Sequence, residues 1–380
     1  MAEHSTIEWT DATWNPVTGC SIVSPGCANC YAMKLAGTRL KNHPSRTALT
    51  VDSKNGPVWN GKVRFNEQWL DQPLRWRRPR MIFVCAHGDL FHEDVPDEWI
   101  DRVYAGMAET WWHTYQVLTK RSARMLAYFA AEDLRDRIGE IQRKAHGDNC
   151  AYTNVGIDAP WPLPNVWLGV SAERQKEADE RIPDLLATPA AIRFLSAEPL
   201  LGPIDLSAIR WQDEDAEIRY NALTAEAWVE NSDSASAYTD ACDGNTRLDW
   251  VIAGGESGDR ASPMHPDWPR ALRDQCAGAD VPFFFKQWGN WSAVSQMSEQ
   301  QIDACYPPLS ERHPDATRHS LVDECVLHAD GSRHRHVDRN AFLQGTGAMS
   351  MFDVGKKRAG RLLDGVEHSG MPQPREVQAL

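Results

Sequence analysis

Three cysteines crowd into eleven residues near the N-terminus of the 380-residue chain. Cys20, Cys27 and Cys30 follow the spacing Cys-x6-Cys-x2-Cys, and a Ser-Pro-Gly turn lies between the first and the second. Gly19 and Gly26 precede two of them, which predicts a loop that can bring three thiolates to one centre. Three thiolates suit a four-iron four-sulfur cluster whose fourth iron stays open to another ligand.

Two other interpretations of these cysteines remain open. Zinc could be held by the three thiolates with a fourth ligand from His, Asp or water. The three cysteines could also be buried without a metal. The nearest histidines, His4 and His43, do not stand at the spacing of a zinc knuckle, so the sequence favours the iron–sulfur cluster over zinc.

Polar residues also gather directly after several apolar runs. In a parallel barrel the active site lies at the carboxyl ends of the strands, so residues at these positions are candidates for a shared site. A strand that leaves a sheet meets water and turns polar in any case, which is the plainer explanation of each cluster by itself. The candidate catalytic residues are Glu198, Glu256 and Lys286. The candidate cofactor-binding residues are Asp89, His92, Lys120, Arg121, Gly254, Gly255, Glu256, Ser257 and Gln287.

The segment Gly254–Gly258 reads Gly-Gly-Glu-Ser-Gly. Glycines let backbone N–H groups point at an oxyanion, so this turn could bind a phosphate or a carboxylate. No Gly-Lys-Ser/Thr follows it, which excludes a Walker A loop. The alternative is an ordinary turn between a strand and the next element, which binds no ligand.

The elements that must position these residues follow an alternating pattern. Six short apolar runs are near-continuous in hydrophobicity, as expected of strands that are buried on both faces. Helical periodicity separates them, most clearly over 100–111, 122–143, 172–187 and 267–277. Strand alternating with helix predicts βαβ units and a parallel sheet. The runs are Ile82–Ala86, Tyr115–Leu118, Val166–Val170, Ile192–Leu195, Trp250–Ala253 and Pro282–Phe285.

We therefore expect an α/β fold, a partial (β/α) barrel of about six parallel strands in a single domain over residues 1–380. Three polar or acidic stretches interrupt the alternation and are expected to be surface insertions, at 144–165, 207–247 and 295–340.

Composition narrows the function classes. Hydrophobic residues make up 42% and charged residues 24% of the chain, which is typical of a globular protein. Forty basic against fifty-three acidic residues give a net charge of -13, which argues against non-specific coating of nucleic acid. A local basic patch for a nucleic-acid substrate stays compatible with that charge. Without a long apolar run or a signal peptide, we expect a cytoplasmic protein with no membrane partner.

The chain resembles an uncharacterised, phage-associated protein family through several motifs taken together. The motif-bearing segments are Thr18–Ala32, Asp89–His92, Leu118–Arg121, Ser196–Ile204, Gly254–Gly258 and Lys286–Gly289. That family in turn is similar to radical S-adenosylmethionine enzymes, in which a three-cysteine loop follows the first strand of a partial β/α barrel. Here the first cysteine gap is six residues instead of three, and the Gly-Gly-Glu turn comes after the fifth run instead of the second strand.

The resemblance implies a four-iron four-sulfur (4Fe-4S) cluster on Cys20, Cys27 and Cys30, with S-adenosylmethionine as a small-molecule cofactor and an external electron donor. The expected function is that of a radical enzyme on an unidentified substrate, with nucleic-acid modification or repair as one class of activity. The alternative is an accessory or binding protein of a phage or mobile element, stapled by zinc or an iron–sulfur cluster and without radical chemistry.

Overall fold

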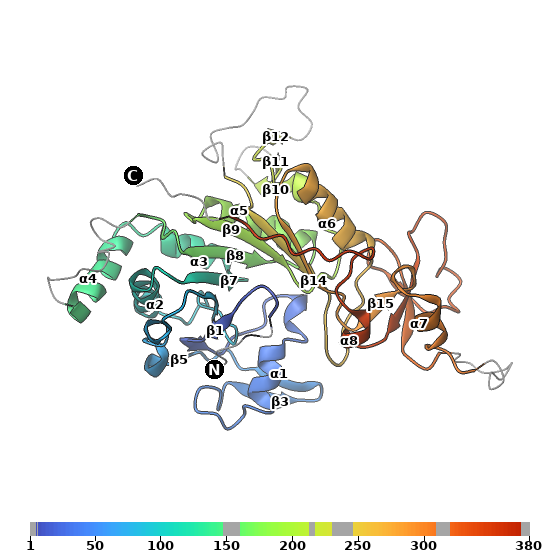
Figure 1. Cartoon of the computed structure of the whole chain (residues 1–380), viewed down its shortest axis with the longest axis horizontal. Helices are drawn as coiled ribbons and strands as arrows, with labels where there is room; N and C mark the ends of the chain where they lie inside the picture. The colour runs from blue at the N-terminus through green and yellow to red at the C-terminus, as the bar shows by residue number, and fades with distance from the viewer. Residues whose placement is uncertain are drawn as a thin grey trace.

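Seven parallel strands form the central sheet in the computed structural model of the protein (Figure 1). The structure describes residues 5, 7–146, 160–212, 217–229, 246–308 and 320–373. The sheet curls into a half-barrel, which confirms the expected partial barrel and all six predicted strands. Its order is β1 (Ala12–Trp14), β6 (Met81–Val84), β7 (Thr114–Thr119), β8 (Val166–Ser171), β9 (Ile192–Ala197), β13 (Trp250–Gly254) and β14 (Phe283–Gln287).

The seventh strand, β1, was not predicted from the sequence. It is only three residues long and follows the polar residue Asp11, so it lacks the apolar run that marks the other six. It pairs in parallel with β6, from Ala12 opposite Ile82 to Trp14 opposite Val84. The cysteine loop, which starts at Gly19, therefore begins five residues after a strand at the edge of the half-barrel.

Helices connect successive strands and bury their apolar sides against the sheet. These are α2 (Asp97–Glu109), α3 (Ser122–Phe129), α4 (Leu134–His146), α5 (Gln175–Ala187) and α6 (Asp267–Gly278). The single helix predicted over 122–143 is two helices, because the chain turns at 130–133 and Asp133 starts the second one, where its carbonyl accepts from the Arg137 N–H. Among the described residues, no helix is long and apolar enough to cross a membrane.

Aromatic side chains fill the inner face of the half-barrel. Trp9 packs on Phe83 and Trp250 with ring centroids 5.0 and 6.1 Å apart, and Trp250 also contacts Trp167, Phe194 and Phe284. A Cβ at Gly169 would lie 2.5 Å from the Phe194 ring, so this strand position has room only for glycine. These rings form a dry floor, and Trp167 and Trp250 are therefore core residues instead of an exposed wall for a cofactor.

Smaller sheets surround the half-barrel. Inside 207–247, an antiparallel sheet forms from β10 (Ile209–Gln212), β11 (Glu217–Tyr220) and β12 (Ala227–Val229). The stretch 295–340 contributes to a second antiparallel sheet that also uses flanking chain, in the order β15 (Trp291–Ala293), β18 (Met349–Asp353), β16 (Glu324–Leu327) and β17 (Arg333–His334). Parts of the three expected insertions, 147–159, 213–216, 230–245 and 309–319, lie outside the described residues.

Short elements complete the fold. Two short antiparallel pairs lie near the cysteine loop, β2 (Val17–Thr18) with β5 (Arg64–Phe65) and β3 (Thr50–Ser53) with β4 (Gly56–Trp59). Helix α1 (Tyr31–Gly37) starts directly after Cys30. The small helices α7 (Glu299–Asp303) and α8 (Lys356–Ala359) accompany the second antiparallel sheet.

Candidate metal and cofactor site

The three cysteines lie on the loop that joins β1 to α1, at the carboxyl end of the sheet. Gly19 holds the start of this loop with a φ of 94°, and a Cβ there would lie 2.2 Å from the Lys62 carbonyl oxygen. Its N–H donates to the His87 carbonyl at 3.1 Å, which ties the loop to the end of β6. Glycine is therefore required immediately before Cys20.

The three thiols share one neighbourhood. Burial, together with the charges of Asp89, Cys30 and Cys27, raises the pKa of the Cys20 thiol to about 12 against the lowering effect of Arg121. Cys20 and Cys30 also pack against one small apolar cluster around Met33 and Trp59. Within the described part of the chain, no three His, Cys, Asp or Glu side chains come together as ligands of a single metal ion.

Arg121, which follows β7, fixes the first cysteine from the side of the barrel. Its guanidinium donates to Asp89 at 3.0 Å, to Glu93 at 2.9 Å and to the Ser21 hydroxyl at 2.6 Å, and Nη1 lies 3.5 Å from the Cys20 sulfur. The Asp89 carboxylate also accepts from the Thr119 hydroxyl at 2.8 Å and from the Lys120 N–H at 3.2 Å. Asp89 and Arg121 thus form hydrogen bonds to each other and to the residues around Cys20. These hydrogen bonds hold the cysteine loop in place.

His92, in the segment that follows β6, supports the same loop. Its Nε2 lies 3.0 Å from the Ser21 hydroxyl, and its backbone N–H donates to the Asp89 backbone carbonyl at 3.3 Å. Burial lowers the pKa of His92, and the nearby Arg121 charge lowers it further, so the ring is neutral at pH 7. A neutral imidazole here serves to hold Ser21.

Glu173, just after β8, is a site residue that sequence reasoning missed. Its carboxylate is fully buried and accepts from the Ser24 hydroxyl at 2.6 Å, from Lys120 and from Arg181 at 3.2 Å. A Cβ at Gly26 would lie 2.5 Å from its Oε1, so the cysteine loop rests directly on this side chain. A single Glu after a strand carries no motif, and only the polar strand end pointed to it.

Above the aromatic floor, a row of polar groups crosses the inner face of the half-barrel. Lys120 donates to the Ser171 hydroxyl at 2.9 Å, and that hydroxyl donates to the Glu198 carbonyl at 3.0 Å. The Glu198 carboxylate pairs with Lys286 at 3.1 Å. The row lies at the strand ends, because Lys120 and Glu198 directly follow β7 and β9, Ser171 ends β8 and Lys286 is the last residue but one of β14. Three of the predicted residues, Lys120, Glu198 and Lys286, are thus brought together.

Gly254 and Gly255 serve close packing. A Cβ on Gly254 would lie 2.5 Å from Glu198 Oε1, and one on Gly255 would lie 2.0 Å from the Trp288 carbonyl oxygen. The Gly255 N–H donates to the Gln287 carbonyl at 2.9 Å, and the Gln287 amide donates back to the Gly255 carbonyl at 3.2 Å. The Gly255 N–H is therefore already engaged within the protein.

Glu256 and Ser257 complete that turn. The Glu256 carboxylate is buried and accepts from the Ser262 N–H at 2.7 Å, so it closes its own loop. Ser257 is half-buried, and its hydroxyl makes no hydrogen bond to a described residue. Both lie at the carboxyl end of β13, at the same edge of the sheet as the cysteine loop.

The loop after β1 meets the loop after β13 across the mouth of the half-barrel. The Asn29 amide donates to the Arg260 carbonyl at 3.1 Å, and Lys34 donates to the Asp259 carbonyl at 3.2 Å. The cysteine loop therefore spans the open side of the sheet and forms one wall of the site.

The sequence model of a family described as "Protein of unknown function (DUF5131)" matches residues 4–372. The chain belongs to this family. The match takes in the whole candidate site, from Cys20 to Gln287. No curated protein matched the chain, and no solved structure matched it either.

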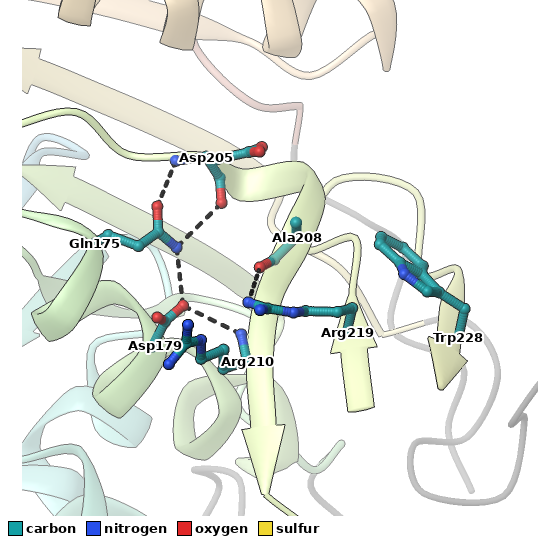
Figure 2. Close-up of a pocket in the computed structure, with 7 residues that line it drawn as sticks. All are labelled: Gln175, Asp179, Asp205, Ala208, Arg210, Arg219 and Trp228. Carbon is teal, nitrogen blue, oxygen red and sulfur yellow. Dashed lines mark hydrogen bonds between the residues drawn. The ribbon is translucent and has the colours of Figure 1, made fainter. Parts of the chain in front are cut away.

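A separate pocket of ≈ 450 Å³ lies beside α5 and the β10–β12 sheet (Figure 2). Its side is a hydrogen-bonded network in which Asp179 accepts from the Gln175 amide at 2.8 Å and from the Arg210 N–H at 3.1 Å. Arg219 and Trp228 line the opposite side. None of the predicted site residues lines this pocket, so it is separate from the candidate site at the cysteine loop.

Proposed function

We propose that this protein is an iron–sulfur, S-adenosylmethionine-dependent radical enzyme. The observation that carries the proposal is the position of the cysteine loop. It directly follows the first strand of a curled parallel sheet, at the carboxyl edge where Glu198 and Lys286 also lie. This is the arrangement that the resemblance to radical S-adenosylmethionine enzymes requires.

The donor set fits a cluster better than a single zinc ion. Ligands of one zinc ion at 2.3 Å must have their sulfurs about 4 Å apart, whereas thiolates on three corners of a cubane stand up to about 7 Å apart. Cys27 and Cys30 raise the pKa of Cys20, and Cys27 raises that of Cys30, yet the three side chains do not meet as ligands of one ion within the described residues. Burial raises the pKa of Cys20 and Cys30, so these two thiols are inert unless a metal displaces their protons.

The chain's own residues would perform distinct tasks around that cluster. Arg121 and Asp89 hold Cys20, and Glu173 holds the turn that carries Gly26 and Cys27. Glu198 would face the ammonium group of the cofactor and Lys286 would neutralise a carboxylate, because both side chains are only partly buried. The aromatic floor excludes water from below. When bound, the cluster would supply the electron for reductive cleavage of S-adenosylmethionine.

The substrate class rests on the resemblance alone, which points to nucleic-acid modification or repair. With a net charge of -13, such a substrate would need a local basic patch, because the whole surface repels phosphates.

The test starts from protein purified and reconstituted without oxygen. We expect about four irons per chain, brown colour, and 5′-deoxyadenosine after addition of dithionite and S-adenosylmethionine. Cys27→Ala should abolish all three results. Cys276→Ala should leave them intact, because this buried thiol lies in α6, away from the loop. Zinc in place of iron, or an intact cluster that does not bind S-adenosylmethionine, would instead favour the accessory-protein function.

A further inference from the structure

Arg46 is a buried arginine without an acidic partner. Its side chain belongs to a residue that is 4% exposed, in the segment between α1 and β3. Nη1 donates to the Ser45 hydroxyl at 2.6 Å, and the guanidinium lies 6.0 Å from the centre of the Trp69 ring. Nε is buried and has no hydrogen-bond partner, and no carboxylate of a described residue forms an ion pair with this guanidinium.

A buried cation without a counter-charge is costly, because water that would solvate it has been removed. Burial lowers the pKa of Arg46 to about 10, which still leaves it charged at pH 7. Nε and Nη2 form the edge of a guanidinium that grips two oxygens of a carboxylate or phosphate at once. On Arg46 this edge is the one that Ser45 leaves open.

His87 brings a second unpartnered donor to the same neighbourhood. Its Nδ1 is buried without a hydrogen-bond partner. The Ser45 carbonyl accepts from the Thr18 hydroxyl at 2.7 Å and the His87 carbonyl accepts from the Gly19 N–H at 3.1 Å, so two adjacent residues hold the segments of Arg46 and His87 together. Burial and the Arg46 charge lower the pKa of His87 to about 4. A neutral imidazole can carry its proton on Nδ1 and donate it to an oxyanion.

Tyr31 connects this pair to the mouth of the half-barrel. Its ring packs edge-on against His87 with centroids 5.8 Å apart, and its hydroxyl donates to the Ala86 carbonyl at 2.7 Å. Because Tyr31 directly follows Cys30, this ring contact places His87 beside the third cysteine.

We propose that Arg46 and His87 form a receptor for one oxyanion group, a carboxylate or a phosphate, of a molecule that binds in the mouth. The guanidinium edge grips two oxygens of the group, and the His87 Nδ1–H donates to one of them. The site needs no metal and does not depend on the radical chemistry proposed above. It explains why a charge is buried here without a protein partner.

The experiment measures thermal unfolding of the full chain, without a cluster, in inorganic phosphate or acetate against chloride at constant ionic strength. An anion that binds only the folded state raises Tm, by about 1–3 °C at ten times its Kd. We expect this rise in the wild type and in Arg39→Gln, since Arg39 is an exposed neighbour. Arg46→Met should lose it, and without anion its Tm should equal or exceed the wild-type value.

A response to phosphate alone assigns a phosphate-bearing ligand, and a response to acetate alone assigns a carboxylate. Arg46→Lys keeps the charge but lacks the two-pronged edge, so it should lose most of the rise even if Arg46→Met does not fold. The proposal fails if neither anion raises the wild-type Tm, or if Arg46→Lys responds as strongly as the wild type. Because the protein carries no cluster in this assay, failure here leaves the radical function to its own test.

Discussion

Replacing Glu173 by Gln should be among the most damaging single substitutions of a polar residue in this protein. Its carboxylate is fully buried and faces two cations, of which Arg181 is also buried, with 3% of its side chain exposed. Removing one partner of a buried ion pair costs about 3–5 kcal/mol of stability, since the remaining buried charge is neither paired nor solvated by water. Arg181 keeps its 2.6 Å bond to the Ser171 carbonyl, and Lys120 is 19% exposed. We therefore expect a loss near the lower limit, about 3 kcal/mol.

Urea unfolding followed by tryptophan fluorescence at pH 7 measures this loss. The matched control is Glu93→Gln, which removes a carboxylate from Arg121 but at a side chain that is 60% exposed. Its cost should stay below about 1 kcal/mol. The substitution at Glu173 should also free Ser24, so a thiol reagent should label Cys27 faster than in the wild type. Equal costs for the two variants would refute the assignment of Glu173 as the support of the cysteine loop.

Gly26→Ala should lower Tm and expose the cysteine loop to proteases, because its Cβ would meet Glu173 Oε1 at 2.5 Å. Gly278→Ala, where a Cβ meets nothing within 4 Å, should leave Tm unchanged or raise it, and an equal loss in both variants would contradict the steric reason. For His87, the folded pKa of about 4 lies below the value of the unfolded chain, so the unfolded state takes up the proton first. Wild-type stability should thus fall as pH drops from about 6.5 to 4, and Tm against pH in His87→Gln should be flatter over that range.

The sequence predicted the sheet well because its strands are buried on both faces. Such strands read as continuous apolar runs, and all six runs pair in parallel. Strand β1 was not predicted because it is too short to show a hydrophobic pattern. Its pairing with β6, a tertiary contact, stabilises it instead. The break between α3 and α4 had a local signal in Asp133, a residue type that favours helix starts.

The site was predictable in position but not in its contacts. Strand ends located Lys120, Glu198 and Lys286 at one edge, and the structure pairs the last two. The spacing of the cysteines could not reveal that Glu173 supports them, because the partner lies 149 residues away along the chain. Nor could it reveal that Arg121 and Asp89 form an ion pair beside the cysteine loop.

The contact between the loops after β1 and β13 determines when the site can form during synthesis. The two hydrogen bonds there join residues 231 and 225 positions apart, Asn29 with Arg260 and Lys34 with Asp259. The cysteines leave the ribosome first, and the residues that close the opposite wall follow more than 200 positions later. Contacts this distant in sequence form late in folding. A nascent or truncated chain would therefore carry the three thiols without their enclosure, and metal insertion into the enclosed site would belong to the completed protein.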